Sequence, residues 1–150
     1  MNTNRRRILT AAASASLLAL APLARSAQVA VEVWKDPNCG CCGEWVKHVE
    51  ANGFAVKVNN TGNNAARARL GIPAALGSCH TAEVAGYAVE GHVPAADIRR
   101  LLAEKPNAVG IALPGMPIGS PGMEQGGRRD PYDVLLVAKG GGTRVFQSHR

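Results

Sequence analysis

Residues 28–58 read QVAVEVWKDPNCGCCGEWVKHVEANGFAVKV, and this segment carries the clearest pattern of secondary structure in the chain. Valines and an aromatic residue in 28–34 favour a strand, and 54–58 alternates as a second strand. Between them, apolar side chains recur at helical spacing over 41–52, and Gly53 is a typical residue for a helix end. Strand, helix and strand in such a short segment predict a βαβ unit.

The rest of the chain predicts further α/β elements. Glycine and proline dominate 110–127, which predicts an irregular loop. The glycine run at 140–142 separates two apolar segments and indicates a hairpin. The predicted fold is a mixed sheet with flanking helices, a Gly/Pro-rich loop and a C-terminal β-hairpin. The other predicted elements are a short helix at 65–70, a weak strand at 74–78, a strand at 83–90, a helix at 94–104, and hairpin strands at 132–138 and 143–147.

The first 27 residues have the layout of a secretory signal peptide. Three arginines at 5–7 precede an apolar, alanine-rich run at 8–21, and small residues allow cleavage after Ser26 or Ala27. The apolar run is shorter than the roughly 20 residues that span a bilayer. The paired arginines also resemble a twin-arginine export signal, and the choice between the two export routes stays open. We therefore expect an exported, periplasmic domain over 28–150, without a membrane span once the signal is cleaved.

The leader also accounts for most of the charge. The whole chain has a formal net charge of +6. The leader contains four arginines and no acidic residue, which leaves 13 basic and 11 acidic residues in the domain. Nucleic-acid binding depends on concentrated positive charge. We therefore expect no nucleic-acid partner.

All four cysteines follow the leader, and three of them fall within four positions: Cys39, Cys41, Cys42 and Cys79. Cys39 and Cys42 form a Cys-x-x-Cys motif at the predicted start of a helix, where the helix dipole favours a thiolate. A strand, this motif and a helix within a βαβ unit form the thioredoxin-like redox arrangement. Cys39 and Cys42 are therefore the candidate catalytic redox pair.

Three interpretations of the cysteines are open. The first is thiol–disulfide exchange through Cys39 and Cys42, and the second is binding of a soft metal. Thiolates gathered at one helix end suit Cu(I), and suit Zn(II) less specifically. The third is a pair of inert disulfides in an oxidising compartment, which explains the crowding poorly. Four cysteines allow three pairings, and the sequence does not choose among them.

Four other residues are candidate additional ligands. His80 follows a cysteine directly and His92 lies twelve positions further on, and both carry an imidazole. Met116 and Met123 lie in the Gly/Pro-rich segment, and their thioether sulfurs favour Cu(I). Each has an ordinary alternative, a hydrogen-bonded histidine or a packed methionine.

Three segments of the sequence carry a resemblance to a known family. They are VWKDPNCGCCGEW (33–45), SCHTAEVAGYAVEGHVPAADI (78–98) and LPGMPIGSPGME (113–124). Together they resemble the CopG-like family of small exported cysteine-rich proteins, formerly a domain of unknown function, with members encoded beside copper-resistance genes. The resemblance implies a thioredoxin-like fold and a copper site. It also implies that four cysteines hold Cu(I) when reduced and form disulfides when oxidised: Cys39, Cys41, Cys42 and Cys79.

The leading hypothesis is a periplasmic copper-binding protein that couples Cu(I) to thiol–disulfide redox and serves copper handling or resistance. Its partners are copper ions and other periplasmic copper proteins. Whether it turns over as a copper-linked oxidoreductase stays open at this stage. The alternative is a thioredoxin-type thiol–disulfide oxidoreductase that needs no metal, and a module with two fixed disulfides is a third hypothesis.

Overall fold

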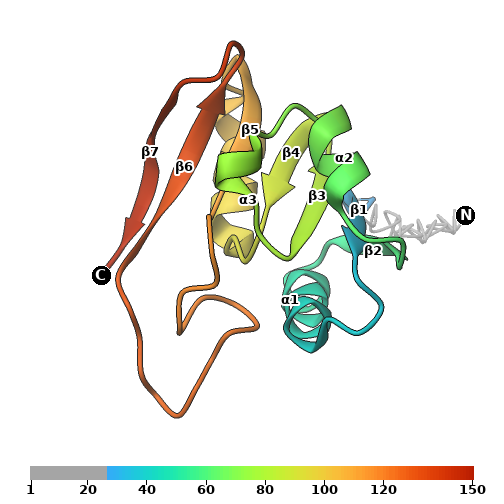
Figure 1. Ribbon diagram of the computed structural model, residues 1–150, viewed down its shortest axis with the longest axis vertical. Coiled ribbons are helices and arrows are strands. Elements are labelled where there is room, and N and C mark those ends of the chain that lie inside the picture. Colours follow the sequence, from blue (N-terminus) through green and yellow to red (C-terminus); the bar gives the residue numbers. More distant parts are fainter. Residues whose placement is uncertain (1–26) are drawn as a thin grey trace, which may run out of the picture.

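The computed structural model describes residues 27–150 and shows a seven-stranded mixed sheet in the order β2-β1-β3-β4-β5-β6-β7 (Figure 1). The predicted signal peptide lies almost entirely outside the described residues. No helix among residues 27–150 is long and apolar enough to cross a membrane. The strands are β1 (Ala30–Lys35), β2 (Ala55–Asn59), β3 (His80–Val84), β4 (Tyr87–Glu90), β5 (Ala108–Ala112), β6 (Tyr132–Ala138) and β7 (Thr143–His149). The helices are α1 (Gly40–Ala51), α2 (Asn64–Arg69), the 3-10 helix η1 (Ala74–Leu76) and α3 (Ala95–Glu104).

The β1–α1–β2 unit forms as predicted. β1 and β2 are parallel, with Ala30 opposite Ala55 and Trp34 opposite Asn59. In α1, the buried side chains are Cys42, Trp45, Val46 and Val49, which share one face at spacings of three, four and seven residues. The chain then leaves α1 through Gly53 at φ 83°, a conformation that glycine adopts without strain.

Two hydrophobic clusters cover the two faces of the sheet. Apolar side chains of α1 and α3, among them Trp45 and Ile98, pack with Val89 and Ile111 in the main core. The neighbouring strand residues point the opposite way because side chains alternate along a strand, and they form a smaller cluster beneath α2 and η1. The smaller cluster contains Ile72, Ala88, Ala112 and Val137.

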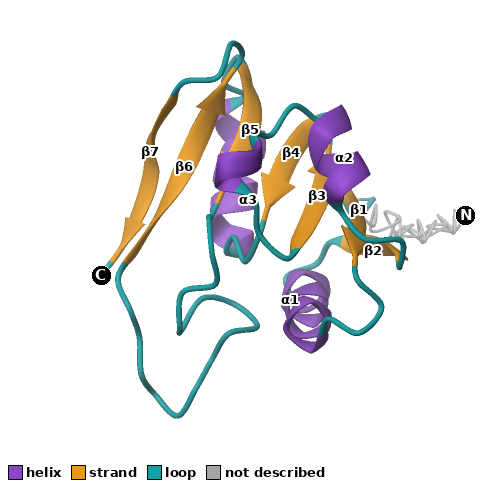
Figure 2. Ribbon diagram, viewed as in Figure 1, coloured by secondary structure: helices purple, strands orange, loops and turns teal. Residues whose placement is uncertain are grey.

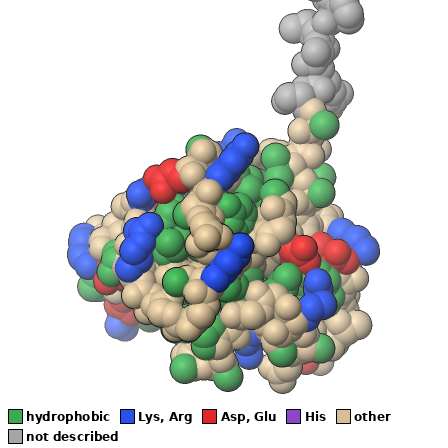
Figure 3. Space-filling model, turned by 90° about the horizontal axis from the view of Figure 1, so that it is seen from above, with side chains coloured by type: hydrophobic (Ala, Val, Ile, Leu, Met, Phe, Trp, Pro, Cys, Tyr) green, Lys and Arg blue, Asp and Glu red, His purple; other side chains and the backbone are tan. Residues whose placement is uncertain are grey.

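The C-terminal half extends the sheet. β4 and β5 are parallel and connected through α3, and β6 and β7 form the predicted antiparallel hairpin (Figure 2). The long segment between β5 and β6 contains no helix or named strand and returns toward α1. On the face shown in Figure 3, acidic and basic side chains are interspersed with apolar ones.

The ends of several elements differ from the sequence prediction by one or two residues, and three segments differ by more. The strand predicted over 83–90 is two strands, because Ala85 (φ 47°) and Gly86 (φ 83°) make a tight turn between β3 and β4. The weak strand predicted over 74–78 is wrong, since Leu76 N–H and Gly77 N–H instead close 3-10 turns onto Pro73 and Ala74.

The third difference is the start of the Gly/Pro-rich segment. Residues 110–112, predicted as loop, belong to β5. A Cβ atom on Gly110 would overlap the backbone of Ala88 in β4, so glycine here allows two strands to lie unusually close. The same residue type that indicates loop in sequence therefore serves close strand packing in this structure.

Candidate metal centre

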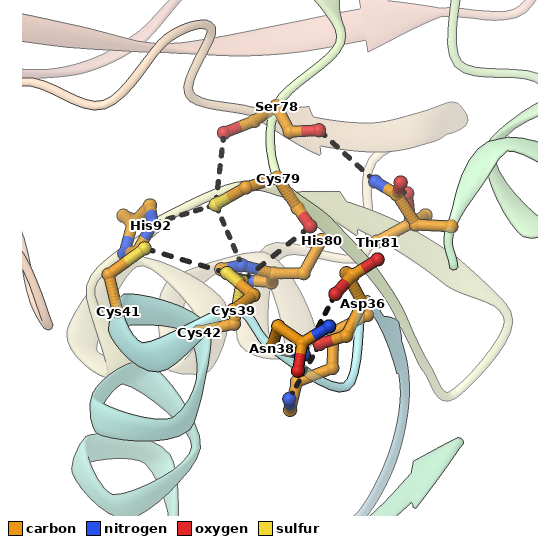
Figure 4. The surroundings of a disulfide bond; sticks show 12 residues. Asp36, Asn38, Cys39, Cys41, Cys42, Ser78, Cys79, His80, Thr81 and His92 are labelled. Carbon is orange, nitrogen blue, oxygen red and sulfur yellow. Dashed lines mark hydrogen bonds between the residues drawn. A yellow bond between two sulfur atoms is a disulfide. The ribbon is translucent and has the colours of Figure 1, made fainter. Parts of the chain in front are cut away.

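The turn after β1 delivers three cysteines to the start of α1 (Figure 4). Asp36 accepts the backbone N–H of Asn38 on its carboxylate (2.8 Å) and that of Cys39 on its carbonyl (3.1 Å). Cys39 is the N-cap residue of α1 and lacks a side-chain capping bond. The free N–H groups and the helix dipole favour negative charge at this position, which suits thiolates.

The structure contains one disulfide, between Cys39 and Cys42, and two free thiols, Cys41 and Cys79. Cys42 is fully buried, whereas Cys41 and Cys79 are partly exposed. The Sγ atoms of Cys39 and Cys41 lie 3.6 Å apart. All four sulfur atoms lie within 4.8 Å of one another, although Cys79 is distant in sequence. Among the three pairings that the sequence leaves open, the structure has the Cys-x-x-Cys pair bonded.

His92 faces Cys79 from the start of the β4–α3 connection. Its Nε2 lies 3.0 Å from Cys79 Sγ, and its Nδ1 lies 2.8 Å from the carbonyl oxygen of Pro121. A carbonyl only accepts, so Nδ1 carries the proton and Nε2 presents a lone pair to the sulfur cluster. Histidines that bind metals typically have this second hydrogen bond. Burial lowers the pKa of His92, which favours the neutral imidazole.

His80 lies beneath the cysteines and is fully buried. Its Nδ1 is 3.6 Å from Cys79 Sγ, and its ring packs against those of Trp45 and His92 at centroid distances of 4.3 and 4.9 Å. Its Nε2 is the one buried side-chain nitrogen or oxygen within residues 27–150 that has no hydrogen-bond partner. Burial and the neighbouring His92 lower the pKa of His80 to about 3. Cys79, His80 and His92 thus form a second set of three potential ligands that shares Cys79 with the four cysteines.

The protein neighbours of the Cys79 thiol do not activate it. Burial, followed by the neighbouring Cys41, raises the pKa of Cys79 to about 11. A metal ion or another cation is therefore needed for Cys79 to act as a thiolate at neutral pH.

The Gly/Pro-rich segment closes the site from the side of α1. A Cβ on Gly122 would lie 2.6 Å from the Cys41 carbonyl oxygen and 2.8 Å from Trp45 N, so only glycine fits here. Met123 is placed by backbone bonds with Gly119 and Ser120. Met116 is half exposed, and its neighbour Gly115 accepts a hydrogen bond from the Ser78 hydroxyl (2.7 Å) beside Cys79. The residue next to each methionine therefore contacts a cysteine-bearing segment: Gly115 contacts Ser78, and Gly122 lies against Cys41.

Sequence reasoning missed the residues that hold the Cys79 segment. One hydrogen-bond network, centred on the buried carboxylate of Glu90, joins Arg67, Ser78, Thr81 and Glu90. The sequence signal was a glutamate at the end of an apolar strand, in Tyr87–Glu90, where a solvent-facing side chain is the ordinary expectation.

The donor set fits a soft metal. Reduction of the disulfide would leave four sulfur donors within 4.8 Å, with the His92 imidazole beside them. Thiolate sulfur favours Cu(I), and the imidazole also suits Cu(II) and Zn(II). The bonded Cys39 and Cys42 cannot serve as thiolate ligands until they are reduced.

Comparisons with known proteins agree with this chemistry. The family model described as "Protein of unknown function, DUF411" matches residues 76–123. A solved structure titled "Copper resistance protein copG- Form 2" is 49% identical with a TM-score of 0.76, over 82% of this chain and 99% of that one. A second, "Copper resistance protein copG- Form 1", is 49% identical with a TM-score of 0.77, over 81% and 98%. No curated protein matches the chain significantly.

Proposed function

The chain belongs to the CopG-like family of copper resistance proteins, and on this premise we propose that it is an exported protein that holds Cu(I) in a four-cysteine site. The copper resistance homologues and the cysteine cluster support a role in copper handling. The observation that carries the proposal is the meeting of four sulfurs within 4.8 Å. The proposed ligands are Cys39, Cys41, Cys42 and Cys79.

The disulfide supports a link between copper binding and thiol redox. Two Cu(II) ions that each accept one electron would oxidise the Cys39 and Cys42 thiols to a disulfide, with release of two protons and formation of two Cu(I) ions. The reverse direction needs a two-electron reductant and returns both thiols. Oxidation removes two of the four sulfur ligands, so the disulfide form should bind Cu(I) more weakly than the dithiol form.

His92 is the additional ligand that the geometry supports best. Its Nε2 lone pair already faces Cys79, and the Pro121 carbonyl fixes its tautomer. His80, Met116 and Met123 stay proposed ligands of lower rank: His80 is buried beneath the cysteines, and Met116 is half exposed. Copper ions are the proposed cargo, Cu(I) ahead of Zn(II), and exchange with other periplasmic copper proteins is the proposed route of delivery.

Anaerobic titration of reduced protein with Cu(I) against a chromophoric chelator tests the proposal. We expect tight binding by the reduced protein, weaker binding by the Cys39–Cys42 disulfide form, and weaker binding by reduced Cys79→Ser. Replacement of the partly exposed His149 by Gln is the matched control for His92→Gln, and only the latter should weaken binding. Absence of tight binding, or binding unchanged in Cys79→Ser, would overturn the proposal.

A second candidate function rests on the position of the disulfide. Cys39 at the N-cap of α1, bonded to Cys42, has the geometry of a thiol–disulfide oxidoreductase that needs no metal. This alternative predicts insulin reduction by metal-free protein and its loss in Cys39→Ser. Free thiols at Cys41 and Cys79 argue against a third view, in which all four cysteines form fixed disulfides. Fractionation of cells expressing the full chain tests the proposed export to the periplasm.

A further inference from the structure

A buried ion pair lies directly behind the Cys79 segment. The Glu90 carboxylate, at the end of β4, is fully buried and accepts three hydrogen bonds. The donors are Arg67 Nε (2.9 Å), the backbone N–H of Ser78 (2.6 Å) and the Thr81 hydroxyl (2.6 Å). Burial raises the pKa of Glu90 overall, and these donors oppose the rise because they favour the carboxylate. Glu90 thus binds the chain on both sides of Cys79, through the Ser78 backbone on one side and the Thr81 side chain on the other.

Arg67 also binds the carbonyl group of Ser78, whose N–H group is bound by Glu90. Arg67 Nη2 donates to the Ser78 carbonyl oxygen (2.5 Å), and Asn63 Nδ2 donates to it as well (3.1 Å). Asn63 is the N-cap residue of α2, yet its side chain makes no capping bond. A Cβ on Gly77 would lie 2.9 Å from the guanidinium carbon of Arg67, so glycine leaves room for the arginine.

These hydrogen bonds hold a segment that strand pairing does not hold. β3 begins at His80, so residues 77–79 lie outside the paired strands and between η1 and β3. The Arg67 side chain is 14% exposed and that of Glu90 is 0% exposed, whereas the other ion pairs among the described residues each include a side chain at least 31% exposed. A buried ion pair contributes little net stability because removing both charges from water is costly, so a gain in stability does not by itself explain this one.

We propose that Arg67 and Glu90 are positioning residues that hold the Cys79 sulfur against the other three cysteines and thereby set the affinity for Cu(I). This inference rests on the proposed function. Neither residue is a proposed ligand. Arg67 acts by joining the Glu90 carboxylate and the Ser78 carbonyl, which a planar guanidinium spans and a single ammonium does not.

The test compares Arg67→Lys with Arg69→Lys. Arg69 lies on the same helix and pairs with Glu83 (3.2 Å) at the surface, so it is a matched control for the loss of a guanidinium. Arg67→Lys should weaken Cu(I) binding by about 10- to 100-fold, as is typical for residues that orient a ligand. Arg69→Lys should leave it unchanged. In a Cys79→Ser background, Arg67→Lys should cause no further loss, because no Cys79 sulfur remains to be positioned.

A second readout does not depend on copper. In the metal-free disulfide form, Arg67→Lys should change the alkylation rate of Cys79 several-fold and leave that of Cys41 unchanged. Where Arg67→Lys fails to fold, Asn63→Ala removes one donor to Ser78 and keeps the ion pair, and it should act in the same direction with a smaller effect.

The positioning role is wrong if Arg67→Lys lowers the Cu(I) affinity equally in the wild-type and Cys79→Ser backgrounds, or if it lowers it in neither. If the wild-type protein binds no Cu(I), the proposed function fails, and the alkylation rates then decide the positioning role alone. A change confined to Cys79 supports it, and equal or absent changes at both thiols refute it.

Discussion

Acid should destabilise the metal-free, disulfide-bonded protein through His80. Its side chain is fully buried, and burial with the nearby His92 lowers its pKa from an ordinary 6.5 to about 3. Between these two values the unfolded chain binds a proton at His80 and the folded chain does not. Stability from this residue is therefore complete above pH 6.5 and is lost progressively as the pH falls toward 3.

The size of the effect follows from the difference between the two pKa values of His80. Each pH unit between them corresponds to about 1.4 kcal/mol, so His80 alone should lower the free energy of unfolding by about 2 kcal/mol between pH 7 and pH 5. Urea unfolding followed by circular dichroism at several pH values measures this quantity. Other titrating groups contribute as well, and subtracting the curve of His80→Phe removes contributions that are common to both proteins.

Val49→Ala is the matched control for this experiment. Val49 is fully buried in the same core, and its truncation should cost about 2 kcal/mol at every pH, because no titratable group is changed. The difference in free energy of unfolding between wild type and His80→Phe should change between pH 7 and pH 5, whereas that between wild type and Val49→Ala should not. If both differences are constant over this range, the argument from burial is refuted.

Three further predictions concern the loop, a thiol and the sheet. Gly122→Ala should lower the free energy of unfolding by about 2–4 kcal/mol and weaken Cu(I) binding, because the methyl group clashes with α1 and the backbone is strained at this φ. Gly127→Ala is the control, since it has a similar φ but open space around it, and an equal loss of stability in chemical denaturation would contradict the clash. Because burial raises the pKa of Cys79 to about 11 against an ordinary 9.0, its alkylation at pH 8, followed by mass spectrometry, should be about 100-fold slower than that of an exposed thiol, and equal rates would refute the shift. Gly110→Ala should cost about 3 kcal/mol or more because β4 leaves no room for a methyl group, and a melting temperature within a few degrees of wild type would show that the strands can separate.

Local patterns predicted the βαβ unit and the C-terminal hairpin well, because each depends on neighbours in sequence. The helix at 41–52 needed only its apolar spacing and Gly53, and α1 is observed at Gly40–Ala51. The prediction of one strand over 83–90 failed at a turn in which Ala85 adopts φ 47°. A positive φ is uncommon for alanine, so the residue type does not predict this turn.

The family resemblance pointed to four cysteines, and the sequence placed three of them at one helix end. The partners of Cys79 depend on atoms far apart in the chain. Its neighbour His92 donates to the carbonyl oxygen of Pro121, 29 positions away, and the carboxylate of Glu90 accepts from Arg67, 23 positions away. Such pairs carry no periodic signal, and a single sequence contains nothing that links them.

Residue types and their local spacing were enough to indicate the chemistry: soft sulfur donors crowd at the start of a helix, and most of the excess positive charge lies before the domain, in the segment predicted to be a signal peptide. Which atoms meet became visible only in the folded chain: Cys39 and Cys42 are bonded, Cys41 is a free thiol, and Cys79 lies beside His92. The two kinds of information differ in the sequence distance over which the interactions act. Residue type and local spacing set chemistry and secondary structure, whereas the position of Cys79 depends on strand pairing and a buried ion pair that form only when distant segments pack together.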